Sequence, residues 1–196
     1  MRKLPLASIG LALVTMLYSM TVAFIVSGSF VGKATMLDLN TYGGITVSSL
    51  SNWEVWRLLT CQFVHAKQYH MFYNVLSIVV LGFFLERRIG WIRVLAVWFL
   101  AGASGTLYST LFVQAPWDTG TGASQGVLGL AGYGIILVAL TKNNRGLVYA
   151  LLFALIPAFS LDLIFAHYPK PGHVLGLTIG MLLGVFSVKK LTRSCT

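Results

Sequence analysis

Long hydrophobic runs, separated by short clusters of polar and basic residues, dominate the chain. A helix needs about 20 apolar residues to cross the hydrocarbon core of a membrane, and six runs come close to that length. The first is too long for the core of a signal peptide and lacks a convincing cleavage site, so we expect an uncleaved span. The six predicted spans are residues 4–26, 70–85, 93–113, 124–141, 147–166 and 172–188.

This pattern predicts an all-α polytopic membrane protein, a bundle of six transmembrane helices in which residues 1–196 form a single domain. The long segment 27–69 has a mixed composition that includes Trp53 and Trp56. Tryptophan favours the membrane interface, so we expect an outer loop that lies partly in the interface. Pro157 lies inside the fifth run and predicts a kink there.

Composition agrees with a membrane protein, because 57% of the residues are hydrophobic and only 10% are charged. A soluble domain carries about 25% charged residues. The net charge of +9 could suggest nucleic-acid binding, but the basic residues are spread between the runs, so we expect no nucleic-acid partner. No motif indicates a metal ion or a cofactor, and we expect neither. Cys61 and Cys195 fall on opposite sides of the predicted topology, so we expect no disulfide between them.

The basic residues also set the orientation of the bundle. Ten of the fourteen fall on one side of the predicted topology, namely Arg2, Lys3, Arg87, Arg88, Arg93, Lys142, Arg145, Lys189, Lys190 and Arg193. The positive-inside rule then places both termini in the cytoplasm. The four histidines, His65, His70, His167 and His173, consequently lie toward the outer side.

Ser124 is the first candidate catalytic residue. It lies between Gly122 and Gly126, where a polar turn leads into the fourth hydrophobic run. A turn of small residues exposes the hydroxyl, and the start of a helix supplies unpaired backbone N–H groups. This combination suits a nucleophile beside an oxyanion site. Taken alone, such a motif is more often a serine N-cap with glycines for close packing.

Helix geometry places four polar residues of three spans in one layer. With a rise of ~1.5 Å per residue, counted from the basic residue that ends each span, the heights are about 27, 24, 25 and 20 Å for Ser124, His173, His70 and Asn74. The hydrocarbon core is about 30 Å thick. The four residues therefore share a layer that is recessed a little below the outer surface.

Residue spacing predicts which side chains can meet in that layer. His70 and Asn74 are spaced i, i+4 and share one helix face. His173 shares a face with a stripe of glycines that permits close approach of a second helix. If that helix is the fourth span, Ser124 and His173 meet. An isolated intramembrane histidine or asparagine more often forms an interhelical hydrogen bond. The glycines of the stripe are Gly176, Gly180 and Gly184.

Five short motifs follow one another between residues 56 and 184. They are Trp56-Arg57 with Leu59-Thr60 and Phe63-Val64-His65, the H-x-x-x-N element His70–Asn74, Gly82 with Glu86, the G-x-S element Gly122-Ala123-Ser124, and Gly172-His173 followed by Gly176 and Gly180. In this order they resemble the motifs of the rhomboid intramembrane serine proteases.

The resemblance implies a six-helix protease with a Ser–His dyad. Ser124 would be the nucleophile and His173 the general base and later acid, while His70, Asn74 and the Ser124 backbone N–H would stabilise the oxyanion. The implied substrates are single-span membrane proteins, cut near the outer face. Water would reach the site through a cavity open to the outer side.

The chain departs from the family pattern at two positions. Gln125 stands where the family usually has glycine, and it could crowd the nucleophile or add a hydrogen bond. Leu128 stands where the family often has an aromatic residue that stacks on the catalytic histidine. Asp162 is the only candidate acid in the last two spans, and we expect an interfacial or helix-end group rather than a third catalytic residue.

Two other functions compete with proteolysis. The departures at Gln125 and Leu128 would suit an inactive rhomboid-like protein that binds membrane clients, but the intact Ser, His and Asn set argues against it. A small transporter or channel is disfavoured because the polar layer lies near one face and no acidic group lies mid-span. Short termini without an organellar targeting segment favour a bacterial inner membrane, with membrane lipid and single-span substrates as partners.

Overall fold

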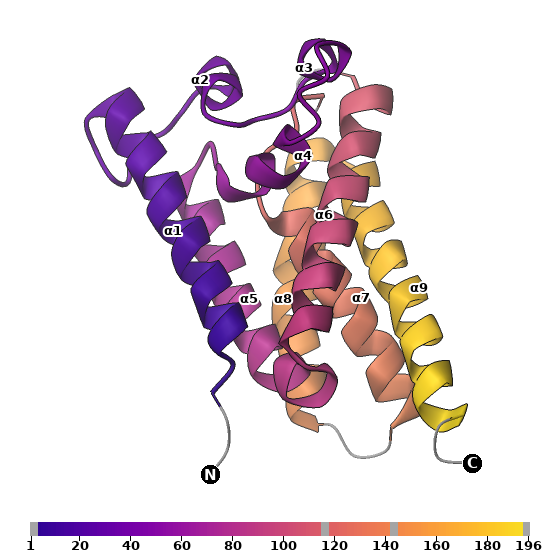
Figure 1. The fold of residues 1–196 in the computed structure, drawn as a ribbon. Helices are drawn as coiled ribbons and strands as arrows, with labels where there is room; N and C mark the ends of the chain where they lie inside the picture. Colours follow the sequence, from indigo (N-terminus) through magenta and orange to yellow (C-terminus); the bar gives the residue numbers. More distant parts are fainter. Residues whose placement is uncertain (1–3, 115–117, 142–144, 194–196) are drawn as a thin grey trace.

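The computed structural model describes residues 4–114, 118–141 and 145–193, and in this part of the chain the regular structure is helical. Each predicted span corresponds to one long helix (Figure 1). These helices are α1 (Leu6–Ser27), α5 (Gln68–Ile89), α6 (Trp91–Phe112), α7 (Ser124–Leu140), α8 (Arg145–Ala166) and α9 (Pro171–Arg193).

Four of these helices, α1, α5, α6 and α8, are long and apolar enough to cross a membrane within the described ranges. Each has 22 residues, which corresponds to about 33 Å of helix. Two further apolar helices, Ser124–Leu140 in α7 and Pro171–Ser187 in α9, are shorter. The chain is therefore an all-α, multi-pass membrane protein.

Two helices extend past the basic clusters that were expected to end them. α5 continues through Glu86, Arg87 and Arg88 to Ile89, and α9 continues to Arg193. The hydrocarbon core limits only the apolar part of a helix, so a helix can continue past it. In α5, Glu86 accepts hydrogen bonds from the start of α1, from the backbone N–H groups of Ala7 and Ser8 and from the Ser8 hydroxyl. Helix α8 contains Pro157 within its length, and the kink expected there stays a prediction.

Some sequence predictions concern residues outside the described ranges. They involve Arg2, Lys3, Lys142 and Cys195. Cys61 itself is a buried free thiol, and burial raises its pKa to about 12.

The segment 27–69 contains more regular structure than an interfacial loop implies. It forms α2 (Met36–Thr41), α3 (Val47–Ser51), α4 (Arg57–Thr60) and a 3₁₀ helix (Cys61–Phe63). Both α2 and α3 begin with a capping box, which satisfies two backbone N–H groups at the start of a helix that is too short to be stable alone. These helices lie at one end of the bundle, opposite the end where α1 begins and α9 ends (Figure 1).

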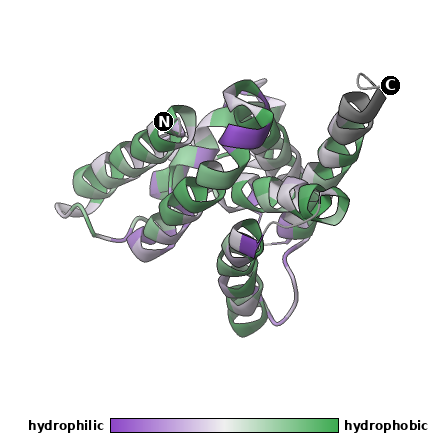
Figure 2. Ribbon diagram, turned by 90° about the horizontal axis from the view of Figure 1, so that it is seen from below, coloured by the Kyte–Doolittle hydropathy of each residue, from purple (hydrophilic) through white to green (hydrophobic). Residues whose placement is uncertain are grey.

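Helix α7 lies at the centre of the bundle, with α6, α8 and α9 around it (Figure 1). All its residues from Ser124 to Gly134 are buried. The outer helices instead expose large hydrophobic side chains, such as Leu17, Phe24 and Ile156, and most of the ribbon in Figure 2 is hydrophobic. Such a surface suits a lipid solvent.

Helices α7 and α9 approach each other backbone to backbone. A Cβ atom added at Gly180 would lie 1.9 Å from the Gly129 carbonyl oxygen, and one added at Gly176 would lie 2.5 Å from that of Gln125. From the α7 side, a Cβ at Gly132 would lie 2.1 Å from the Leu177 carbonyl oxygen. The predicted glycine stripe therefore packs on α7, the partner that brings the starts of both helices together.

We predict that Gly180→Ala destabilises the protein, because its methyl group must displace the α7 backbone. Overpacking of this kind costs about 1–3 kcal/mol, and the unfolding midpoint in detergent should fall. Gly10→Ala is the matched control, since an added Cβ there meets nothing within 4 Å and helix propensity improves. An unfolding midpoint for Gly180→Ala equal to that of the unmodified protein would contradict this packing.

Candidate active site

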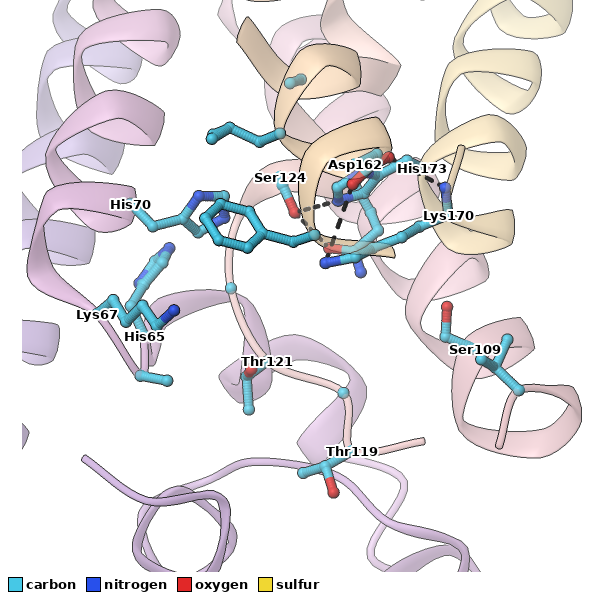
Figure 3. Close-up of a pocket in the computed structure, with 18 of the residues that line it drawn as sticks. His65, Lys67, His70, Ser109, Thr119, Thr121, Ser124, Asp162, Lys170 and His173 are labelled. Atoms are coloured by element: carbon cyan, nitrogen blue, oxygen red, sulfur yellow. Dashed lines mark hydrogen bonds and ion pairs between the residues drawn. The ribbon is translucent and has the colours of Figure 1, made fainter. Parts of the chain in front are cut away.

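A cavity of about 270 Å³ lies where α7 and α9 begin and α8 ends. Its lining combines side chains of the segment before α5 with those of the long helices, and includes His70, Ser124, Asp162, Lys170 and His173. Figure 3 shows Ser124 between His70 on one side and His173 with Asp162 on the other. Of the four residues that the sequence places in one layer, Ser124, His70 and His173 therefore line the same cavity.

Ser124 is the first residue of α7, and its side chain does not cap that helix. The N-cap is Ala123, which makes no side-chain cap hydrogen bond. The Ser124 Oγ instead lies 2.8 Å from the Nε2 atom of His173. Both side chains are buried, with 5% and 6% exposure. The serine therefore faces a base rather than its own helix terminus, which excludes the simple N-cap interpretation.

Asp162 corrects one expectation from the sequence. It is not an interfacial group, because it is only 1% exposed in the last turns of α8. Its Oδ2 atom lies 2.7 Å from Nδ1 of His173 and accepts a second hydrogen bond, of 3.0 Å, from the backbone N–H of Lys170. A buried carboxylate is costly unless it is paired in this way.

These contacts fix where the protons of a neutral His173 lie. A carboxylate can only accept hydrogen bonds, so Nδ1 carries the ring proton and donates it to Asp162. The Nε2 atom is then an acceptor and receives the hydroxyl proton of Ser124. This is the tautomer that a general base next to a serine requires.

The two expected oxyanion donors have different surroundings. His70 lines the cavity together with Ser124. Asn74 is fully buried and is not among the residues that line the cavity. Its Nδ2 atom lies 3.2 Å from Nε2 of His65, so one of its two N–H groups is directed to that ring. The N–H groups of the first turn of α7, that of Ser124 included, have no carbonyl partner within the helix.

The positions that depart from the family pattern are both buried. Ser124 Oγ also donates toward the Oε1 atom of Gln125, at 3.2 Å, so the larger side chain adds an acceptor that competes with His173 Nε2 for the single hydroxyl proton. Leu128 is fully buried. Within the described ranges no aromatic ring stacks on His173, whose two ring nitrogens are held by Ser124 and Asp162.

The segment before α5 holds the turn that precedes Ser124. Gly120 exchanges two backbone hydrogen bonds with Ile45, and the N–H of Gly122 donates to the carbonyl of Cys61 at 2.8 Å. The N–H of Ala123 donates to Nε2 of His65 at 3.1 Å. Gly122 has a φ of +92°, which favours glycine. The segment before α5 therefore sets the backbone position of the nucleophile.

A family model described as the rhomboid domain matches residues 52–190. The chain belongs to the rhomboid family. RHOMBOID-like protein 1 of Arabidopsis thaliana is 33% identical over 78% of this chain, which corresponds to 40% of that relative's length. Putative rhomboid protease YdcA of Bacillus subtilis is 30% identical, with coverage of 74% of this chain and 73% of the relative.

The rhomboid relatives include proteins named as proteases and one named as inactive. Rhomboid-like protease 1 of Toxoplasma gondii is 32% identical over 70% of this chain. Inactive RHOMBOID-like protein 8 of Arabidopsis thaliana is 35% identical over 54% of this chain and 29% of its own length. The chain spans less than half the length of the Arabidopsis relatives that it matches. Family membership is therefore established, and activity must be argued from the site.

Two residues of this rhomboid have contacts that the sequence interpretation missed. For Asp162 a signal existed, because it lies about 26 Å above Arg145 by helix rise, in the layer of Ser124 and His173. For His65 no periodic signal existed. It contacts Ala123, 58 residues later, from an irregular segment.

We predict that His65 makes the stability of this rhomboid pH-dependent. Burial lowers the pKa of its imidazole from 6.5 to about 3, and protonation of Nε2 would also break the bond from Ala123. Between these pH values the unfolded chain binds a proton that the folded chain does not. The His65 contribution to stability is therefore complete above pH 6.5 and is lost as the pH falls toward 3.

The measurement is the unfolding midpoint in detergent across this pH range. His65→Gln keeps an acceptor for the Ala123 N–H but cannot be protonated, so its midpoint should fall less steeply with acid than that of the unmodified protein. His167→Gln, which changes an exposed histidine, should keep the original slope. Equal slopes for His65→Gln and the unmodified rhomboid would show that His65 does not titrate as we expect.

Proposed function

We propose that this rhomboid is an intramembrane serine endopeptidase that hydrolyses peptide bonds in or near the transmembrane segments of membrane proteins. The observation that carries the proposal is the 2.8 Å contact between Ser124 Oγ and His173 Nε2, buried at the edge of a cavity. A serine hydroxyl is a weak nucleophile unless a base can take its proton, and this contact supplies the base.

The proposed reaction proceeds through an acyl-enzyme. Ser124 Oγ attacks the carbonyl carbon of the scissile bond while its proton passes to His173 Nε2. As the tetrahedral intermediate collapses, the C–N bond breaks and His173 returns that proton to the leaving amine. A water molecule then attacks the ester, giving its proton to His173, and the serine leaves with that proton as the carboxylic acid product forms.

Developing charge on the carbonyl oxygen requires hydrogen-bond donors that are already in place. The proposed donors are the Ser124 backbone N–H, His70 in the cavity wall and Asn74. Asn74 is buried and does not line the cavity, so it would have to reach the substrate oxygen with the N–H that is not directed to His65. Loss of one such donor costs roughly 3–4 kcal/mol of transition-state stabilisation.

The proposed topology is six spans with both termini in the cytoplasm. The cavity lies at the end of the bundle opposite the start of α1 and the end of α9, so it would open to the outer side, and water for deacylation would enter there. A bacterial inner membrane and single-span substrates remain predictions from the sequence.

An inactive, client-binding rhomboid is the second candidate. The observation that favours it is the similarity to a relative named Inactive RHOMBOID-like protein 8. Against it stands the contact of Ser124 with His173, which a protein that only binds clients does not need. Measured cleavage therefore separates the two functions.

We predict that Ser124→Ala and His173→Ala each lower cleavage of a reconstituted single-span substrate by about 10⁴-fold or more. Ser109→Ala removes a hydroxyl from the same cavity wall and should cleave at nearly the unmodified rate, as should His167→Ala. Cleavage fragments are quantified by gel and mass spectrometry, with insertion checked for each variant. Undiminished cleavage by the folded Ser124→Ala or His173→Ala protein would exclude the proposed mechanism.

A further inference from the structure

The carboxylate of Asp162 is the most deeply buried acidic group near the cavity, and its contacts converge on His173. The Oδ2 atom accepts from His173 Nδ1 at 2.7 Å and from the Lys170 backbone N–H at 3.0 Å. The Lys170 Nζ atom lies 3.9 Å from Oδ1. Asp162 thus contacts the imidazole at the ring nitrogen that does not face Ser124.

A purely structural role would explain only part of this arrangement. The bond from the Lys170 N–H ties the end of α8 to the start of α9, and a carboxylate could be retained for that reason alone. It does not account for the second bond, in which the same oxygen holds the ring nitrogen opposite the one that meets the serine. The imidazole is therefore fixed at both nitrogens, by Ser124 and by Asp162.

We propose that Asp162 is a positioning residue that completes a Ser124–His173–Asp162 triad, in place of the Ser–His dyad that the family resemblance implies. The proposal rests on the proposed protease function. Asp162 holds His173 in the tautomer with the proton on Nδ1 and fixes the plane of the ring. When the Ser124 proton reaches Nε2, the carboxylate stabilises the resulting imidazolium without taking a proton itself.

The surroundings of His173 support this assignment. The family often stacks an aromatic residue on the catalytic histidine, but this chain has the buried Leu128 at that position. A leucine side chain controls the plane of a neighbouring ring less than a stacked aromatic does, and neither of them fixes the tautomer, which depends on hydrogen bonds to the ring nitrogens. The charge of Asp162 is balanced by the ammonium group of Lys170. The pKa of Lys170 is lowered overall, mainly because the group is partly buried, and the nearby carboxylate of Asp162 offsets part of that decrease. The acid thus supplies orientation that packing alone would not.

The test compares Asp162→Ala and Asp162→Asn with the unmodified protein and with the control Asp38→Asn, which changes a carboxylate on α2 that does not line the cavity. We expect kcat for a single-span substrate to fall by about 10²- to 10⁴-fold in both Asp162 variants, with KM nearly unchanged. Asp162→Asn keeps an acceptor for the Lys170 N–H, so it separates the loss of charge from any loss of folding. A kcat within about twofold of the unmodified value in folded Asp162→Asn would overturn the proposal.

A second readout does not depend on activity. In protein labelled with ¹⁵N at histidine, the His173 Nδ1 proton bonded to a carboxylate should give a far-downfield signal that is absent from His173→Ala and lost in Asp162→Ala. No such signal in the unmodified protein would overturn the positioning role. If the protein shows this signal but cleaves no substrate, the proposed protease function is wrong, while the positioning of His173 by Asp162 is supported.

Discussion

The close approach of α7 and α9 is the constraint on which the rest of the structure depends. The Gly129 carbonyl lies where any side chain at Gly180 would have to be, and the same is true of Gln125 and Gly176. Small residues let two helices pack closely in lipid, where no hydrophobic effect drives them together. Because Ser124 begins α7 and His173 lies in the first turn of α9, this packing sets the distance between nucleophile and base.

Two other parts of the chain act on the pair that this packing brings together. From outside the bundle, the segment before α5 holds the turn that leads into Ser124, through backbone bonds to Gly122 and through the buried ring of His65. From α8, Asp162 holds the far nitrogen of His173. The serine is thus positioned through its backbone and the histidine through its ring, by elements that are distant in sequence.

The sequence could predict those features that follow from periodicity and helix rise. The lengths of the hydrophobic runs predicted the long helices, and counting residues from basic clusters placed Ser124 and His173 at matching heights. Helix rise also places Asp162 at the height of Ser124 and His173. An acid near the end of an apolar helix can equally well be solvated at the membrane interface, so only its buried contact with His173 distinguishes the two roles. The position of His65 could not be predicted, because an irregular segment with short capped helices has no period from which its path follows.

The central claim is that Ser124 is an activated nucleophile, and covalent labelling with a fluorophosphonate tests it most directly, before any substrate is known. The account predicts that the folded, unmodified protein gains one adduct, mapped to Ser124 by mass spectrometry. The adduct should be absent from Ser124→Ala and strongly reduced in His173→Ala. An intact protein in which Ser124 stays unlabelled, or in which Ser124→Ala labels equally, would contradict it.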